Sequence, residues 1–220
     1  MKDLLKNLIK NGRQAVGVTL IFMLVCGFAF PLTMTAIGGL LFPYQAGGSI
    51  ITVNDVAVGS EIVGQEFKSD YFLYSRPSAC HYNVYAEDEN GNYIYSDGSA
   101  FAGLSSGSFN YGPSNPLLLD RMENDLELFL KAHPYLKRED IPADILTASG
   151  SGLDPHISPE AARVQVQRIA QNSGLSEETV NSIITDNTKG KLMGIFGEET
   201  VNVLGVNIDI ASAMGIIGEN

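Results

Sequence analysis

The clearest nucleophile pattern in the chain is a Gly-x-Ser-x-Gly sequence at residues 103–107, with Ser105 at its centre. In hydrolases with this motif the serine lies on a sharp turn between a strand and a helix, and a histidine and an acid complete the triad. His156 follows Ser105 along the chain. The flanking residues are rich in Gly and Ser, however, which predicts a loop on both sides. A serine hydrolase using Ser105 therefore stays a remote alternative.

The residues that could bind ions do not have the spacing of known ion sites. Residues 88–92 (Asp-Glu-Asn-Gly-Asn) begin like a calcium loop, but the glycine comes at the fourth position instead of the sixth, which predicts a simple turn. Asp154 could form a local polar site with His156, or both could bond loop backbone. No phosphate-binding loop is present. We predict no metal site, because metal-ligand spacing is missing around each histidine: His81, His133 and His156.

The longest apolar segment of the chain lies near its N-terminus and predicts a membrane helix. Residues 15–42 contain no charged residue and no His over 28 positions, whereas about 20 helical residues cross a bilayer. The run is too long for the apolar core of a cleaved signal peptide, which has about 7–15 residues. Val25 stands before Cys26, where a lipoprotein signal needs a small residue. We predict a retained transmembrane helix over residues 15–42, kinked or divided at Pro31.

The charges on either side of this helix predict its orientation. Residues 1–14 form a basic lead-in with four Lys and Arg against one acid, and no basic residue follows the run until Lys68. The positive-inside rule then places the N-terminus in the cytoplasm. We therefore predict a single-pass protein of the cell membrane, with an extracytoplasmic domain over residues 43–220.

The predicted domain is acidic. Residues 43–220 carry 10 Lys and Arg against 24 Asp and Glu, a formal charge of −14. Such a surface repels nucleic acid and anionic lipid, and it could concentrate cations or dock a basic partner. An acidic surface that only keeps the domain soluble is the ordinary alternative. Cys26 and Cys80 are not expected to pair, because Cys26 lies in the membrane segment.

Turn signals and periodicity predict an α+β fold: one N-terminal transmembrane helix, then a single mixed domain with short antiparallel strands and about three helices. Alternating apolar residues around Asn54-Asp55, and aromatic residues around Asn90-Gly91, predict two hairpins. Residues 97–115 are Gly- and Ser-rich and predict a long loop.

Helix starts are predicted at three N-cap residues, Asn115, Ser158 and Ser176. The second helix should end at Gly174. Alternating apolar residues between 201 and 210 suggest a closing strand. The first helix should bury an apolar face that comprises Leu119, Met122, Leu126, Phe129 and Leu130.

Several motifs occur in order along nearly the whole chain. They lie at residues 42–49, 58–60, 64–67, 71–79, 112–116, 147–159, 161–168 and 201–204. The most specific is Thr-Ala-Ser-Gly-Ser-Gly-Leu-Asp-Pro-His-Ile-Ser-Pro at 147–159. These motifs resemble one family, the C subunit of the Kdp-type potassium-transporting P-type ATPase of bacteria. Residues about 84–108, with the Tyr-rich hairpin, look like an insertion relative to that family.

The resemblance implies a non-catalytic accessory subunit of a high-affinity, ATP-driven potassium uptake pump. In the family the B subunit hydrolyses ATP and a channel-like A subunit selects K⁺, so ATP and K⁺ are handled by the complex. The A and B subunits, a small single-span F subunit and the lipid bilayer are the implied partners. The C subunit is described as needed for assembly and for potassium or ATP affinity, the latter as a catalytic chaperone of the B subunit.

The resemblance also implies site residues. The glutamine of the Gln-Val-x-Arg stretch, Gln165, would act in nucleotide affinity. That role conflicts with an extracytoplasmic domain, which cannot meet cytoplasmic ATP, and we favour a domain over the outer mouth of the A subunit. A purely structural clamp between pump subunits is the alternative. The motif loops implied at subunit contacts contain Arg76, Pro77, Ser78, Asn115, Pro116, Ser149, Ser151, Asp154 and His156.

Overall fold

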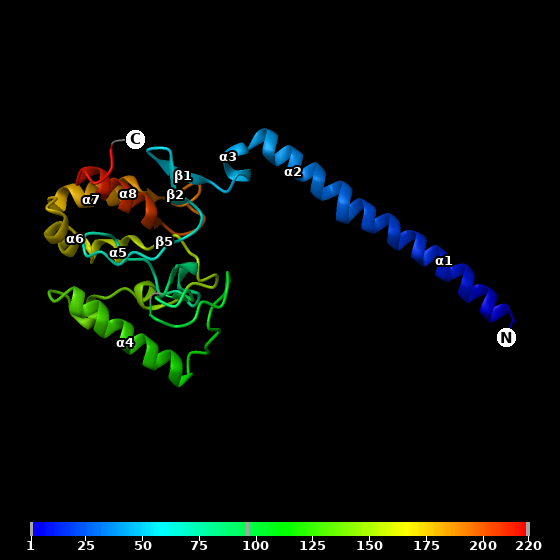
Figure 1. Cartoon of the computed structure of the whole chain (residues 1–220), viewed down its shortest axis with the longest axis horizontal. Coiled ribbons are helices and arrows are strands. Elements are labelled where there is room, and N and C mark those ends of the chain that lie inside the picture. The colour runs from blue at the N-terminus through cyan, green and yellow to red at the C-terminus, as the bar shows by residue number, and fades with distance from the viewer. Residues whose placement is uncertain (1, 96, 219–220) are drawn as a thin grey trace. The chain divides into compact units, whose positions relative to one another are not determined.

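The computed structural model describes residues 2–95 and 97–218, with side chains from Asn11 onward. The chain divides into two units, Met1–Ser49 and Ile50–Asn220 (Figure 1). The first unit is almost entirely helical. The second is an α+β domain with short antiparallel strands, as the sequence predicts.

The first unit consists of two α-helices, α1 (Lys2–Leu24) and α2 (Phe30–Leu41), and a short third, α3 (Pro43–Ala46). A π-helical turn, Val25–Ala29, separates α1 from α2, and Phe30 N–H donates to Val25 O five residues back. Pro31 has no N–H to continue the ordinary ladder, and a wider turn accommodates this loss. The helical stretch Asn11–Leu41 is long and apolar enough to cross a membrane, and its large apolar side chains are exposed.

The second unit begins with the first predicted hairpin. Strands β1 (Ile50–Val53) and β2 (Val56–Ser60) pair antiparallel. Asn54 and Asp55 both have positive φ, as the two central residues of a type I′ turn require. The second predicted hairpin also forms, from β3 (Tyr85–Glu87) and β4 (Tyr93–Tyr95). Residues 97–115 form the expected loop.

The predicted caps begin helices where expected. Asn115 accepts from Leu117 N at the start of α4 (Pro116–Ala132), and Ser176 accepts from Thr179 N at the start of α7 (Glu177–Asp186). Ser158 caps a helix that differs from the prediction, because it is interrupted at Val164 and Gln165. It forms α5 (Pro159–Arg163) and α6 (Val166–Ser173), and Gly174 ends it in a left-handed conformation.

The predicted closing strand over 201–210 is wrong. Only Thr200–Asn202 form a strand, β7, which pairs with β5 (His156–Ile157) on one side and β6 (Thr188–Lys189) on the other. The Asn202 side chain accepts from Gly205 N and starts helix α8 (Val203–Ala213). The residues buried on α8 recur at helical spacing: Val203, Leu204, Val206, Asn207, Ile210 and Ala211.

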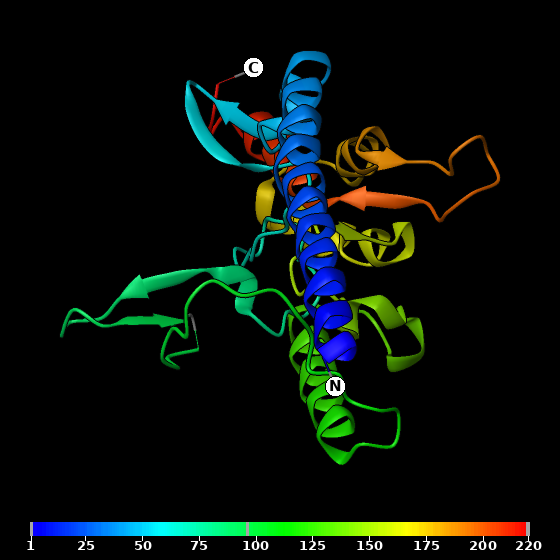
Figure 2. The same ribbon diagram turned by 90° about the vertical axis from the view of Figure 1, so that its right-hand side faces the viewer.

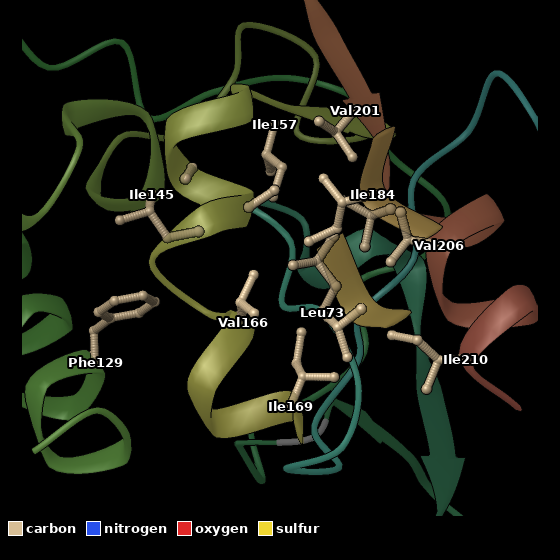
Figure 3. Close-up of a cluster of buried hydrophobic side chains, with 14 of the residues drawn as sticks. Leu73, Phe129, Ile145, Ile157, Val166, Ile169, Ile184, Val201, Val206 and Ile210 are labelled. Atoms are coloured by element: carbon tan, nitrogen blue, oxygen red, sulfur yellow. The ribbon is translucent and has the colours of Figure 1, made fainter. Parts of the chain in front are cut away.

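The hydrophobic core lies between these helices and the small sheet. Figure 3 shows Leu73 beside Ile169 and Ile210, with Val201 and Ile184 above them. From α4, Leu126 and Phe129 are buried in this core. Leu119 was expected to face the core but is 57% exposed. Only the later turns of α4 therefore pack against the core.

Three short 3-10 helices occur in the described part of the domain besides these elements. They comprise His81–Asn83, Arg138–Asp140 and Ala143–Leu146. The first has left-handed φ at His81, Tyr82 and Asn83. Tyr82 therefore belongs to a tight turn, and the strand before Asn90-Gly91 begins only at Tyr85.

Candidate functional site

The structure joins two motif loops that are far apart in the sequence, residues 75–82 and 147–157, which we call the loop junction. Ser78 connects them through one oxygen atom. Its Oγ donates to Gly152 O at 2.6 Å and accepts from Cys80 N at 3.2 Å and Tyr82 N at 3.0 Å. A single hydroxyl thus fixes both loops, because it uses its donor and both acceptor positions.

Gly152 lies at the tightest point of the loop junction. Its φ is +67°, and a Cβ built on it would meet Gly107 O at 2.6 Å and Cys80 Sγ at 2.7 Å. Gly152 N donates to Ser149 Oγ at 2.9 Å, and Ser149 is buried. The neighbouring Ser151 accepts from Leu153 N at 3.1 Å. Ser149 and Ser151 therefore shape the loop instead of presenting a reactive group.

A charged group lies beside the loop junction. Arg76 Nη1 donates to Asp154 Oδ2 at 3.1 Å, and Arg76 Nε donates to Thr147 O at 3.2 Å. Asp154 Oδ1 accepts from His156 N at 3.0 Å and lies 3.5 Å from His156 Nδ1. Bonds from His156, assisted by the Arg76 charge, lower the pKa of Asp154. Asp154 and His156 therefore lie together in a local polar group, in which the Asp154 carboxylate also accepts from loop backbone.

Tyr82 is buried beside Arg76 and Asp154. Its hydroxyl donates to Arg76 O at 2.9 Å, and burial together with the Asp154 charge raises its pKa to about 12. The ring lies so close to Gly64 that a Cβ there would meet Tyr82 Cε1 at 2.6 Å and Asp154 O at 2.5 Å. The motif glycine at position 64 is therefore explained by packing.

A cleft opens next to the loop junction. It has a volume of about 250 Å³, and Arg76, Pro77 and Ser78 line part of it. Charges of both signs face it, including Lys68 and Asp125. Among the described residues, no group of three or more His, Cys, Asp and Glu side chains is arranged to hold a metal ion.

Not every predicted site residue belongs to the loop junction. Asn115 and Pro116 start α4, where they cap the helix and set its first turn. Ser105 lies in an exposed loop, where its backbone pairs with the Asn83 side chain at 3.0 Å in both directions. No strand precedes Ser105 and no helix follows it within the described segment 97–115, so the nucleophile geometry that the motif requires is missing.

Gln165 lies in a second, deeper cluster. It is 0% exposed. Its Oε1 accepts from Tyr74 N at 2.9 Å, and its Nε2 donates to Ala161 O at 3.0 Å and Tyr74 O at 3.4 Å. On the other side of the same extended segment, the Asn207 amide bonds Leu73 N at 2.7 Å and Leu73 O at 3.0 Å. Two side-chain amides thus replace the strand neighbours that this buried backbone lacks.

Arg168 completes this deeper cluster and is 3% exposed. Its guanidinium donates to Gln165 Oε1 at 2.8 Å, Phe72 O at 2.9 Å and Asp70 O. Its Cζ also lies 3.7 Å from the centre of the Tyr74 ring. Burial lowers the pKa of Arg168. The guanidinium bonds neutral acceptors and lies against an aromatic face. Burial of this charge is therefore tolerated only while these contacts are in place.

His133 is the remaining partner of Arg168. It is 0% exposed, and its Nδ1 bonds Phe129 O at 2.8 Å while Nε2 receives Arg168 Nε at 2.8 Å. This arrangement requires the neutral tautomer with hydrogen on Nδ1. Burial lowers the pKa of His133 to about 4. The imidazole is therefore neutral at pH 7, as its role as acceptor demands.

Sequence reasoning did not predict this cluster as a unit. Asn207 gave one signal, because it is the only polar side chain between Val203 and Ile208, and such a residue must find a partner when it is buried. Arg168 belongs to the Gln-Val-x-Arg motif, but the motif does not show that Arg168 meets His133 across the fold, and His133 gave no signal of its own.

The nucleotide role that the resemblance implies for Gln165 stays a prediction. A nucleotide could reach Gln165 only after its bonds to Tyr74, Ala161 and Arg168 opened. The geometry favours a role in holding the fold.

Together, the fold and the site define a class of protein: an acidic α+β domain with locked motif loops, attached to one helix that is apolar and long enough to cross a membrane. A family model described as "K+-transporting ATPase, c chain" (KdpC) matches residues 12–212. The chain therefore belongs to the KdpC family, and it is a subunit of a P-type potassium-transporting ATPase.

Curated relatives are similar in sequence to this chain over most of their length. The potassium-transporting ATPase KdpC subunit of Clostridium kluyveri is 50% identical over 202 residues, covering 92% of this chain and 93% of the relative. That of Clostridioides difficile is 46% identical over 214 residues, covering 95% of this chain and 100% of the relative. That of Caldanaerobacter subterraneus is 44% identical over 198 residues, covering 90% of this chain and 93% of the relative.

Proposed function

We propose that this chain is a non-catalytic accessory subunit of a high-affinity potassium uptake pump, and that its domain acts outside the cytoplasm. The partners would be a channel-like A subunit, an ATP-hydrolysing B subunit and a small single-span F subunit. The observation that carries the proposal is the charge pattern: a basic lead-in, an uncharged 28-residue run, then a domain with a formal charge of −14. The positive-inside rule assigns such a domain to the outer face.

An acidic domain near the outer mouth of a potassium pore would raise the local concentration of K⁺. This mechanism needs neither a metal site nor a bound nucleotide in this chain. Under the proposed orientation Gln165 does not contact ATP, and any effect of its substitution on pump activity would act through the fold of the domain.

The first test is topology. Cys80 is only 6% exposed and is a poor target, whereas Leu104 is 80% exposed. With the chain expressed in its pump, Leu104→Cys is expected to react with a membrane-impermeant thiol reagent in intact cells. The unsubstituted chain, which has Cys26 and Cys80, provides the background. Reaction of Leu104→Cys only after the cells are opened would reverse the orientation and restore the possibility of ATP contact.

The second test separates potassium affinity from a purely structural clamp. Two exposed acidic pairs lie in different parts of the domain, Glu87 with Glu89, and Glu177 with Glu178. Each pair is replaced by Gln in a separate double variant. If the acidic surface concentrates K⁺, at least one of the two variants raises the apparent KM for K⁺ at low ionic strength by about twofold or more. High salt removes the difference. An unchanged KM in both double variants favours the clamp.

A further inference from the structure

The connection between β6 and β7 carries an apolar tip, residues 192–196, that the fold does not use. Leu192, Met193, Ile195 and Phe196 are 69%, 84%, 75% and 64% exposed, respectively. Figure 2 shows this orange loop extending away from the rest of the domain. Exposed side chains of this size in adjacent positions mark interaction sites on soluble surfaces.

The apolar tip is a built turn. Leu192 N donates to Phe196 O at 2.8 Å, Phe196 N donates to Leu192 O at 3.0 Å, and Gly194 N donates to Lys191 O at 3.0 Å. Met193 has a φ of +54° and Gly194 a φ of +73°. A left-handed methionine is unfavourable on its own. The three hydrogen bonds hold the backbone of the turn in one conformation despite this cost, which reduces the backbone entropy lost on binding.

The surrounding charges favour a protein partner over lipid. Glu198 lies two residues from Phe196, its side chain is 87% exposed, and it pairs with Lys191 at 3.4 Å. Insertion of the tip into a bilayer would bring Glu198 to the headgroups, and the domain's formal charge of −14 is repelled by anionic lipid. An apolar pocket on a protein can accept the tip and leave this ion pair in water.

The size of the tip limits the kind of partner. Four side chains make a contact much smaller than the roughly 1,000 Å² that a specific interface needs by itself. The partner must therefore be held close by a second contact, which raises its effective concentration. In a membrane complex, packing of the apolar helix Asn11–Leu41 against another subunit would supply such a contact.

We propose that the apolar tip, residues 192–196, inserts into an apolar pocket on a neighbouring subunit of the same pump. This inference rests on the proposed function, because it requires the chain to be assembled with pump subunits. The four large side chains act as the anchor, and the hydrogen-bonded turn keeps them in place for docking.

The test uses the complete pump in native membranes. A photoreactive phenylalanine analogue replaces Ile195, and irradiation is expected to give a covalent adduct with another pump subunit. The same analogue at Leu104, which is 80% exposed in a different loop, is the matched control and should give little adduct. An adduct with lipid alone, or no adduct at Ile195, overturns the inference.

A second measurement covers the energetic role of the tip. The double variant Leu192→Ser with Phe196→Ser should reduce recovery of the pump complex after detergent extraction by about fivefold or more. Leu104→Ser should leave recovery unchanged. Because the tip side chains are exposed, the melting temperature of the chain should not fall. Unchanged recovery of the double variant contradicts the anchoring role. Loss of other pump subunits even from the unsubstituted chain would contradict the proposed function itself.

Discussion

Replacing Arg168 by Met is expected to lower the free energy of unfolding by about 3–5 kcal/mol, because His133 Nε2 and Phe72 O lose their donor inside the domain, while Gln165 Oε1 keeps only its bond from Tyr74 N. Gln165 Oε1, Phe72 O and His133 Nε2 each receive a hydrogen bond from this guanidinium at 2.8–2.9 Å. Each buried acceptor left unpaired costs about 1–3 kcal/mol. The regained hydration of the charge offsets part of this cost, and Met fills part of the volume.

The measurement is denaturant unfolding of the full chain in detergent, followed by near-ultraviolet circular dichroism of its tyrosines, since the chain contains no Trp. Arg163→Met is the matched control. Arg163 belongs to the neighbouring helix α5, is 63% exposed and pairs with Glu160 at 3.6 Å. Its replacement should change stability by no more than about 0.5 kcal/mol. Equal stability of the two variants would show that the Arg168 bonds contribute little.

Replacing Gly152 by Ala should destabilise the loop junction by about 3 kcal/mol or more. A left-handed φ of +67° disfavours any L side chain, and the new methyl group would collide with Gly107 O and Cys80 Sγ. Both neighbours are themselves fixed, because Gly107 N bonds Ser151 O at 2.7 Å and Cys80 is buried. Relief of the collision therefore requires residues 147–157 to move away from both Cys80 and Gly107.

Gly150→Ala provides a control two residues away. A Cβ at Gly150 meets nothing within 4 Å, and its φ is not left-handed. This variant should have nearly unchanged stability, whereas Gly152→Ala should lower both the melting temperature and the amount of chain recovered with the pump. If Gly152→Ala keeps the melting temperature of the parent chain, the loop junction is not the rigid element that its contacts indicate.

Local signals predicted the parts of this fold that local physics controls. Asn54-Asp55 turned the first hairpin, and Asn115, Ser158 and Ser176 capped helices because each side chain satisfies a backbone N–H of its own first turn. The run at residues 15–42 predicted the membrane helix by its length of 28 residues and its lack of charge.

The prediction was wrong where two periodicities fitted the same residues. Apolar positions between 201 and 210 fit a strand by alternation, yet α8 forms there. The Asn202 side chain caps the helix at Gly205 N, and packing of one helical face against the core decides the outcome. Alternation registers neither factor, because the cap is a side-chain bond to a backbone N–H three residues on, and the packing is a contact with the rest of the core.

The sequence by itself determined the membrane segment, the acidic domain, the helix starts and the family motifs, since each depends on composition or on residues a few positions apart. Only the tertiary structure decided what those motifs do. Ser78 meets Gly152 across 74 positions, and Gln165 bonds Tyr74 across 91. Such contacts form when the second unit collapses around its core, and no local pattern specifies them. The same collapse buries Gln165 in the interior, and it leaves the apolar tip at residues 192–196 exposed to meet a partner.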